Sequence, residues 1–306
     1  MADATLGPRP TTLIEAPRLS DRLGATVVLA TETFQYTGSF KFRAAYNVAK
    51  SVPHPMIITA SSGNFGQALA LACRLMNKRC IVVMPENSAR VKIEAVQSYG
   101  AATELVDTTK VTREARVAEL AKQHPEAYVA SAYDDPLDID GNASLGYELA
   151  RTPYAFDAII VPVGGGGLSS GIVQGLRASG SQTPVFGAEP LLANDAAQSL
   201  RAGHVVVNES EPQSIADGAR TRSLGKHNWA ILREGLAGII EVPEAQIIEA
   251  VRLLFALAHL KAEPTGALTT GALLADPRFT GQTVCLVVSG GNVDPALYGR
   301  ILAGEI

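Results

Sequence analysis

The stretch that decides the fold reads Ala158-Ile159-Ile160-Val161-Pro162-Val163-Gly164-Gly165-Gly166-Gly167-Leu168-Ser169. Its first half is a continuous apolar run, which is typical of a strand buried on both faces of a parallel sheet. The four glycines have no Cβ and permit a sharp turn with positive φ. Residues 168–178 then have the composition of a helix. A strand, a glycine turn and a helix in this order predict one unit of an α/β protein.

Further strand and helix signals lie on both sides of this unit. Short apolar runs predict strands at residues 26–30, 56–59, 80–84, 103–106, 185–188 and 284–288. Helices are predicted at residues 67–76, 88–99 and 111–124. This alternation predicts right-handed crossovers and mostly parallel, twisted sheets. We therefore expect two open α/β domains, a large one from residues 1–52 and 135–306 and a small mobile one from residues 53–134, with a ligand in the cleft between them.

Length and composition exclude several classes of protein. The 306 residues are enough for about two domains, and the apolar share of 47% argues against intrinsic disorder. A net charge of −4 gives no reason to expect a nucleic-acid partner. No apolar run reaches the roughly 18 residues of a membrane span, and three cysteines without metal-ligand spacing exclude a disulfide framework. We expect a cytoplasmic protein that acts on a small molecule.

The glycine run is a candidate phosphate site. The backbone N–H groups of Gly164, Gly165, Gly166 and Gly167 can point inward at the start of the following helix, whose dipole favours an anion. A flexible loop is the alternative interpretation. Neither the dinucleotide-binding fingerprint nor the P-loop matches, because no ribose-binding acid and no Gly-Lys-Ser/Thr follows in the right place.

Two other segments contain residues with chemical potential. Ser61-Ser62-Gly63-Asn64-Phe65 lies between a strand and a helix, where small polar residues can bind a carboxylate; simple capping of the helix is the alternative. Lys41 lies between Phe40 and Phe42. Desolvation there would lower the pKa of the amine and free it for Schiff-base chemistry. An ordinary lysine on a helix surface is the alternative.

The motifs combine into a family resemblance. Gly38-Ser39-Phe40-Lys41, Ser61-Ser62-Gly63-Asn64, the glycine run and Ser289-Gly290-Gly291-Asn292 follow one another along the chain. In this order they resemble the tryptophan-synthase-β family, or fold type II, of pyridoxal-phosphate enzymes. Within it, the sequence is most similar to the serine/threonine dehydratases and serine racemase. Residues 189–190, 215–218 and 263–267 extend a resemblance that covers about residues 10–302.

The resemblance implies which residues hold the cofactor, pyridoxal 5′-phosphate. Lys41 would bind it covalently and Asn64 would hydrogen-bond its 3′-oxygen. Ser289 would face the pyridine nitrogen, where a serine leaves the ring largely unprotonated and suits β-elimination more than transamination. The remaining cofactor residues would flank the ring or bind the phosphate: Phe40, Gly164, Gly165, Gly166, Gly167 and Leu168.

The resemblance also implies how substrate is handled. Lys41 would take the proton from Cα after substrate has replaced it on the cofactor. Ser62 would be an acid/base on the opposite face, which permits inversion at Cα. The substrate carboxylate would be bound by Ser61, Ser62, Gly63, Asn64 and Phe65. Phe65 departs from the histidine of many dehydratases, and residues 140–144 depart from their Ala-Gly-Gln-Gly-Thr pattern.

A metal site is implied in the same way. Glu189, Asp195 and the carbonyl of Ala193 would hold Mg²⁺ or Ca²⁺, which take oxygen ligands and several waters. The alternative is a capped helix start with solvated acids.

We therefore expect a pyridoxal-phosphate-dependent ammonia-lyase, or dehydratase. It would convert a β-hydroxy amino acid such as L-threonine or L-serine to a 2-oxo acid and ammonia. The alternative with the same cofactor is an amino-acid racemase that uses Lys41 and Ser62 on opposite faces. A phosphate- or nucleotide-binding module is the alternative from another class. The resemblance also implies a homodimer.

Overall fold

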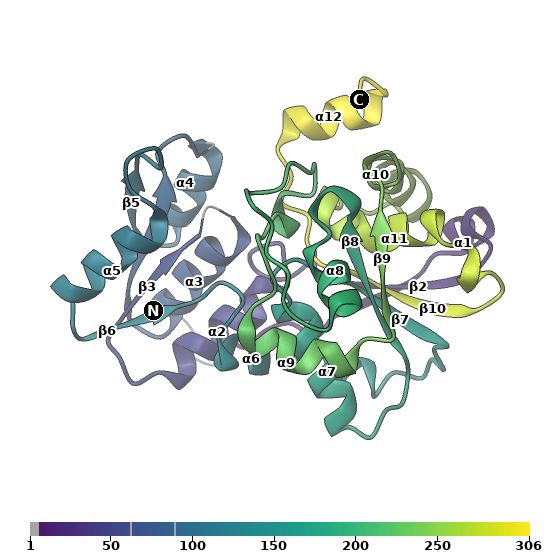
Figure 1. Cartoon of the computed structure of the whole chain (residues 1–306), viewed down its shortest axis with the longest axis horizontal. Coiled ribbons are helices and arrows are strands. Elements are labelled where there is room, and N and C mark those ends of the chain that lie inside the picture. The colour runs from purple at the N-terminus through teal and green to yellow at the C-terminus, as the bar shows by residue number, and fades with distance from the viewer. Residues whose placement is uncertain (1–5, 62, 89) are drawn as a thin grey trace.

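The computed structural model describes residues 6–61, 63–88 and 90–306, which form two sheets with helices packed on them (Figure 1). The strands are β1 (Thr12–Glu15), β2 (Thr26–Thr31), β3 (Met56–Ala60), β4 (Arg79–Pro85), β5 (Ala102–Val106), β6 (Ala127–Ala130), β7 (Ala158–Pro162), β8 (Val185–Pro190), β9 (Gly238–Val242) and β10 (Thr283–Val288). The helices are α1 (Pro17–Leu23), α2 (Lys41–Ser51), α3 (Asn64–Leu75), α4 (Arg90–Ser98), α5 (Arg113–Gln123), α6 (Pro136–Leu149), α7 (Gly167–Ala178), α8 (Asp195–Ala202), α9 (Lys226–Gly235), α10 (Glu244–Ala258), α11 (Pro264–Ala275) and α12 (Pro295–Ala303).

The larger sheet has the order β1-β2-β10-β7-β8-β9. Its strands are parallel except for β1, which pairs antiparallel with β2. Side chains of β10 alternate between two cores, as the period of two in a strand requires. Val284 and Leu286 pack with α1, α10 and α11, whereas Cys285 and Val287 pack with α6, α7 and α9. Both faces of this sheet are therefore covered, which explains the continuous apolar runs.

The smaller sheet has the order β5-β4-β3-β6, and all of its strands are parallel. Ile57 packs toward α2 and α3, and Ile58 packs toward α5. Figure 1 shows this unit, with α3, α4 and α5, beside the larger one. The helix that begins at Lys41 thus shares the core of the four-stranded sheet.

The structure confirms the predicted fold class of two mostly parallel α/β sheets. The antiparallel β1 and the strands β6 and β9 were not predicted. The domain boundaries at residues 52/53 and 134/135 stay predictions. The three cysteines are buried free thiols. No helix among the described residues is long and apolar enough to cross a membrane.

Glycines let α6 approach its neighbours closely. A Cβ at Gly141 would lie 2.6 Å from the carbonyl oxygen of Arg43 in α2. A Cβ at Gly171 of α7 would lie 2.5 Å from Cβ of Asn142. Any larger residue at either position would force the helices apart. The first turn of α2, the second turn of α6 and the second turn of α7 are therefore fixed close to one another.

Candidate active site

Lys41 is the first residue of α2, and its amine lies between aromatic rings. Nζ is 4.8 Å from the ring centre of Phe40 and 5.7 Å from that of Phe65. Nζ also donates a hydrogen bond to the carbonyl oxygen of Ala132. Burial lowers the pKa of Lys41, and the carboxyl of Asp138 acts in the opposite direction. The side chain is therefore not a solvated surface lysine but an amine with a weakened hold on its proton.

The glycine loop follows β7 and leads into α7. Among the described residues, none accepts a hydrogen bond from the backbone N–H groups of Gly164, Gly165, Gly166 or Gly167. Gly166 has φ +98°, which L side chains rarely adopt. Four unpaired N–H groups at a helix N-terminus form an anion site, because both the donors and the helix dipole favour negative charge.

The loop is held from behind by a tyrosine and an asparagine. A Cβ at Gly165 would overlap the ring of Tyr133. Asn228 Nδ2 donates to the carbonyl oxygens of Tyr133 (2.9 Å) and Gly165 (2.7 Å). Gly167, expected in the loop, is the first residue of α7. These contacts leave no room for side chains in the loop and make it a fixed element.

Asn64 is linked to two residues from the far end of the chain. Its Nδ2 donates to Glu263 Oε1 (2.8 Å), and its Oδ1 accepts from Asn292 Nδ2 (2.8 Å). Burial raises the pKa of Glu263 to about 8, with a smaller contribution from Asp217. One N–H of the Asn64 amide stays available for a ligand, since the group carries two donors.

The predicted turn at residues 61–65 also caps helix α3, which was the alternative interpretation of its sequence. Ser61 Oγ accepts hydrogen bonds from the N–H groups of Gly66 (3.1 Å) and Gly63 (3.4 Å), so it caps the start of α3. Phe65 is buried against Lys41. Ser62, the predicted second acid/base, lies outside the described residues.

Ser289 and Phe40 meet at the end of β10. The Phe40 N–H donates to the Ser289 carbonyl oxygen (2.9 Å), and Ser39 forms a β-bridge with Gly290. Ser289 is buried there. The lysine segment and the Ser-Gly-Gly-Asn segment are therefore joined by main-chain hydrogen bonds, although the sequence separates them by about 250 residues.

Asp138 is a carboxyl that the sequence interpretation overlooked. It lies in the first turn of α6 and is fully buried. Its Oδ2 accepts from Asn142 Nδ2 (3.0 Å) and would lie 2.6 Å from a Cβ at Gly167. The available signal was the Asp138-Asn142 pair at a spacing of four, which places both on one helix face. Glu263 and Asn292 were quoted in motifs but given no role.

The predicted metal residues form a buried acidic pair. The Glu189 carboxyl accepts from the N–H groups of Ala196 and Ala197 (both 2.9 Å), so it caps α8. Asp195 Oδ1 accepts from Asn208 Nδ2 (3.0 Å), while its buried Oδ2 has no partner among the described residues. Burial raises the pKa of Asp195 to about 7 and, together with repulsion by Asp195, raises that of Glu189. No group of three His, Cys, Asp or Glu suited to a metal occurs in the described part of the chain.

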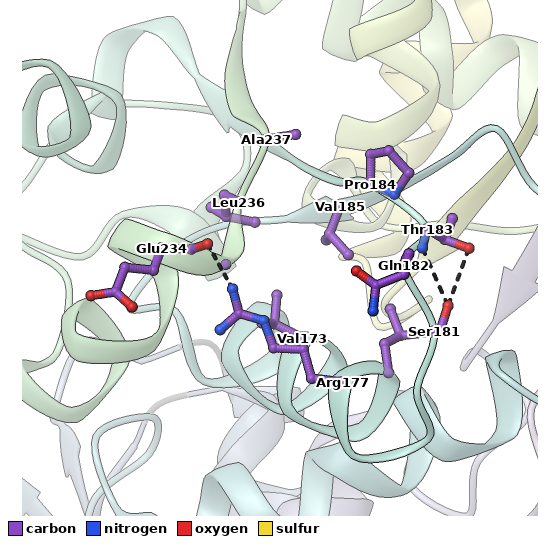
Figure 2. Close-up of a pocket in the computed structure, with 12 residues that line it drawn as sticks. Val173, Arg177, Ser181, Gln182, Thr183, Pro184, Val185, Glu234, Leu236 and Ala237 are labelled. Atoms are coloured by element: carbon purple, nitrogen blue, oxygen red, sulfur yellow. Dashed lines mark hydrogen bonds between the residues drawn. The ribbon is translucent and has the colours of Figure 1, made fainter.

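Two hollows in the described part of the chain are lined by none of the predicted site residues. One has a volume of about 260 Å³ and lies between the ends of α7 and α9. There Arg177 donates to the carbonyl oxygen of Glu234 (2.6 Å), as Figure 2 shows. The other, of about 460 Å³, is lined by residues from both sheet units, including the charged residues Lys92, Arg113, Glu114, Glu211 and Arg220. Lys92 bridges the two units through an ion pair with Asp217 (3.0 Å).

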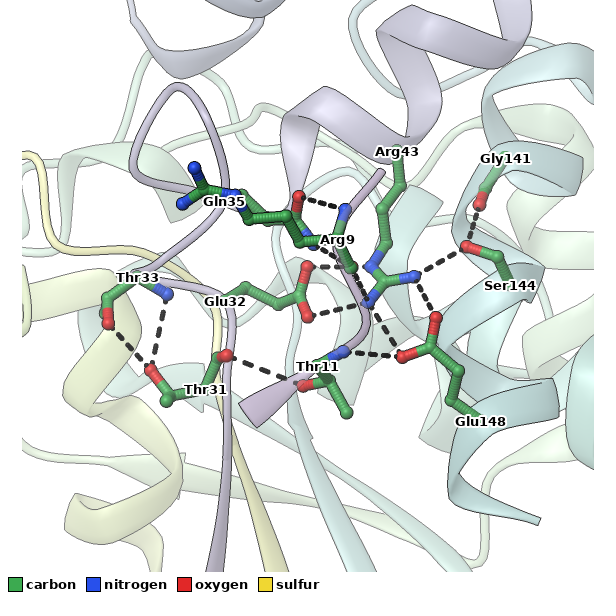
Figure 3. A network of polar contacts seen from close by, with 10 residues as sticks. All are labelled: Arg9, Thr11, Thr31, Glu32, Thr33, Gln35, Arg43, Gly141, Ser144 and Glu148. Atoms are coloured by element: carbon green, nitrogen blue, oxygen red, sulfur yellow. Dashed lines mark hydrogen bonds and ion pairs between the residues drawn. The ribbon is translucent and has the colours of Figure 1, made fainter. Parts of the chain in front are cut away.

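A buried arginine fixes the helix that carries Lys41. Arg43 pairs with Glu32 (2.7 Å) and Glu148 (2.6 Å) and donates to Ser144 Oγ (2.9 Å), as Figure 3 shows. Its Nη2 also reaches the carbonyl oxygen of Arg9 (3.2 Å). These contacts join the N-terminal arm, the loop after β2, and α6 to the first turn of α2.

Known proteins share both the sequence and the fold of this chain. Residues 4–290 match the family model described as pyridoxal-phosphate dependent enzyme. The L-threo-3-hydroxyaspartate ammonia-lyase of Saccharomyces cerevisiae is 36% identical, over 96% of this chain and 91% of the relative. Serine racemase of Mus musculus is 33% identical, over 93% and 86%. The crystal structure of the threonine deaminase from T.th. has a TM-score of 0.89 and 37% identity, and 94% of each chain is covered.

Proposed function

Because the chain belongs to the pyridoxal-phosphate dependent enzyme family, we propose that it is an ammonia-lyase that releases ammonia from a β-hydroxy dicarboxylic amino acid. The observation that carries this proposal is the desolvated amine of Lys41, whose charge interacts with Asp138, the carboxyl that lies against the glycine loop. The N–H groups of that loop have no acceptor among the described residues. The relatives named ammonia-lyase and threonine deaminase support the coarser activity. The dicarboxylic substrate is the finer part of the proposal.

The residues present fit the cofactor. Gly164, Gly165, Gly166 and Gly167 offer N–H donors to a phosphate dianion without side chains in the way. Lys41 supplies an amine with a lowered pKa, which is the form that reacts with an aldehyde. When bound, pyridoxal phosphate takes up the electrons that are released as the Cα–H bond breaks.

The chain's own groups would do the rest of the chemistry. Lys41 Nζ takes the Cα proton as a general base, for which a lowered pKa is suited. The aromatic rings of Phe40 and Phe65 exclude water from that amine. Loss of hydroxide from Cβ then gives an enamine, which hydrolyses to a 2-oxo acid and ammonia.

One cation in the larger hollow, Arg113, supports a substrate with a second carboxylate. Arg113 begins α5, and no ion pair of Arg113 is found within residues 6–61, 63–88 and 90–306. Burial raises the pKa of Tyr133, the charges of Asp134, Glu114 and Asp195 raise it further, and Arg113 lowers it. The ring of Tyr133 lies against Gly165. We infer that Arg113 binds the distal carboxylate of 3-hydroxyaspartate.

The first test is a substrate panel. Purified protein is incubated with the isomers of 3-hydroxyaspartate, L-serine, L-threonine and allo-threonine, and 2-oxo acid is measured. We expect the highest kcat/KM for one isomer of 3-hydroxyaspartate. Faster release from L-threonine or L-serine would contradict the dicarboxylic substrate but keep the lyase. No 2-oxo acid from any of them would refute the lyase.

Replacing the lysine tests the role of the amine. Lys41→Ala should lower the rate of 2-oxo acid release by at least about 100-fold, because a positioned general base contributes 10²–10⁴-fold. The visible absorption of the bound cofactor should disappear. Lys50→Ala, at the exposed far end of the same helix, is the control and should keep both.

Replacing Arg113 tests the proposed substrate. Arg113→Gln should raise KM for 3-hydroxyaspartate about 10- to 100-fold, because a charged hydrogen bond contributes about 1.5–3 kcal/mol. The kinetic constants for L-serine should change little. Arg116→Gln is the matched control, since Arg116 lies on the same helix and pairs with Glu104 and Glu119. An equal rise for both substrates would contradict binding of the distal carboxylate.

Racemisation is the second candidate function, favoured by the relatives named serine racemase. It needs an acid on the face opposite Lys41, and Ser62 is the proposed residue. Chiral analysis of the substrate panel tests it: inversion of L-serine that Ser62→Ala abolishes would support it, whereas retention of configuration would exclude it.

The metal site and the homodimer also remain proposals. The partnerless Oδ2 of Asp195, unpaired within the described residues and beside the Glu189 carboxyl, fits a cation that both acids would hold with the Ala193 carbonyl. Light scattering at several protein concentrations would test the dimer.

A further inference from the structure

A buried polar cluster lies directly behind the glycine loop, and the function proposed above does not use it. The Asp138 cluster consists of Asp138 and Asn142, one turn apart on α6, and it faces α7. Asp138 Oδ2 would lie 2.6 Å from a Cβ at Gly167, so the carboxyl fills the space that the missing side chain leaves. The cluster and the loop are therefore in direct contact.

The cluster is incompletely hydrogen-bonded. Asp138 Oδ1 and Asn142 Oδ1 are buried and have no partner among the described residues, and Ser170 Oγ of α7 is in the same condition. A buried acceptor without a donor destabilises the fold, and more so if it is charged. A proton on Asp138 removes the charge and supplies one donor. Geometry alone thus favours a neutral carboxyl.

Charged groups act on Asp138 from helix α2 and from the segment that precedes α6. Lys41 approaches from α2, and Asp134 and Asp135 precede α6. The described residues of α7 that face the cluster are uncharged, since Arg177 lies at the far end of that helix. Burial raises the pKa of Asp138 to about 7, and Lys41 opposes this. The carboxyl therefore changes its charge within the physiological pH range.

We propose that Asp138 takes up a proton when the glycine loop binds the phosphate of the cofactor, and releases it when the loop is empty. This rests on the proposed function. A dianion at the loop N–H groups places negative charge beside the carboxyl, and a like charge nearby disfavours ionisation. The added proton comes from solvent and forms one O–H bond, and no other bond changes.

This coupling makes cofactor binding depend on pH. Below about pH 7 the carboxyl is already neutral, so the phosphate meets no repulsion. Above that pH the proton must be taken from solvent, and the affinity should fall by up to about tenfold per pH unit. The cofactor would therefore be retained less well in alkaline solution.

The test is calorimetric titration of the cofactor-free full chain with pyridoxal phosphate at pH 8. Buffers with different ionisation enthalpies give the number of protons taken up. Asp138→Asn keeps the shape without the acid. Asp140→Asn is the matched control, because Asp140 is exposed on the same helix and accepts from Gln174 (2.7 Å). Protons exchanged by the cofactor itself cancel between the three proteins. Because Asp138 raises the pKa of Lys41, the titration is repeated with inorganic phosphate, which does not react with the amine.

We expect wild type and Asp140→Asn to take up about one proton more than Asp138→Asn. Equal values in all three would overturn the inference. Binding of pyridoxal phosphate without any such difference leaves the proposed function intact, whereas no binding to wild type refutes both. If Asp138→Asn does not fold, infrared difference spectra of ¹³C-aspartate-labelled wild type decide: a protonated carboxyl band must appear when the cofactor binds, and its absence overturns the inference.

Discussion

Helix α6 carries two buried polar clusters that are built in opposite ways. Toward α2, the arginine cluster joins Arg43 to Glu32, Ser144 and Glu148, and every guanidinium nitrogen donates a hydrogen bond. Toward α7, the Asp138 cluster leaves Asp138 Oδ1 and Asn142 Oδ1 unpaired within the described residues. The paired cluster fixes structure, and the unpaired one has capacity left for a proton and a ligand.

The contrast follows from electrostatics. Breaking a buried ion pair leaves an uncompensated charge, so the arginine cluster can hold only one protonation state. An isolated buried carboxyl instead shifts its pKa and becomes neutral. Proteins place perturbed acids of this kind at functional sites more often than elsewhere. Helix α2 contributes to both clusters: Arg43 forms the fully paired arginine cluster, and Lys41 carries the charge that interacts with Asp138.

The largest expected effect breaks the paired cluster. Arg43→Met should lower the free energy of unfolding by about 3–5 kcal/mol, because Glu32 would stay buried and charged. Urea denaturation measures this. Adding Glu32→Gln should restore part of the loss. Arg79→Met, which removes an exposed pair with Glu126, should cost no more than about 1 kcal/mol. Equal losses for Arg43→Met and Arg79→Met would show that the buried arginine cluster contributes no more to stability than an exposed ion pair does.

The next effect concerns the unpaired cluster and has the opposite sign. The pKa of Asp138 in the folded protein is raised to about 7, against about 3.9 when unfolded. The stability it contributes is present below about pH 4 and is lost as pH rises through about 7. Asp138→Asn should therefore gain on wild type, cofactor-free, by about 1–3 kcal/mol between pH 5 and pH 8. Urea denaturation at both pH values checks this; a constant difference would show that the carboxyl does not titrate there.

A third effect extends the comparison to the acidic pair of Glu189 and Asp195. Asp195 also has a buried oxygen that is unpaired within the described residues, and a pKa raised to about 7. If that oxygen is a ligand, Mg²⁺ at about 100 times its Kd should stabilise the fold by about 2.7 kcal/mol. Thermal unfolding with Mg²⁺ or a chelator measures the shift. Asp195→Asn should abolish it, and a shift that survives the substitution would place the cation elsewhere.

Local patterns in the chain were enough to predict much of the fold. The apolar run of residues 158–163 and the glycines after it predicted β7 and the turn into α7. Such patterns predict secondary structure because the spacing of apolar residues and the positions of glycines determine the local backbone conformation. The order of the motifs also predicted the family, because each motif is a short contiguous segment that can be identified without knowing the fold.

Contacts between distant segments decided the rest. Asn64 and Glu263 meet although 199 residues separate them, and Arg43 reaches Ser144 and Glu148 across more than a hundred. The lowered pKa of Lys41 and the raised pKa of Asp138 arise from burial that several elements create together. By itself the sequence determined which residues could do chemistry here. Only the tertiary structure decided which acids are paired and which are free to carry a proton, because desolvation and neighbouring charge depend on the packing of the whole chain.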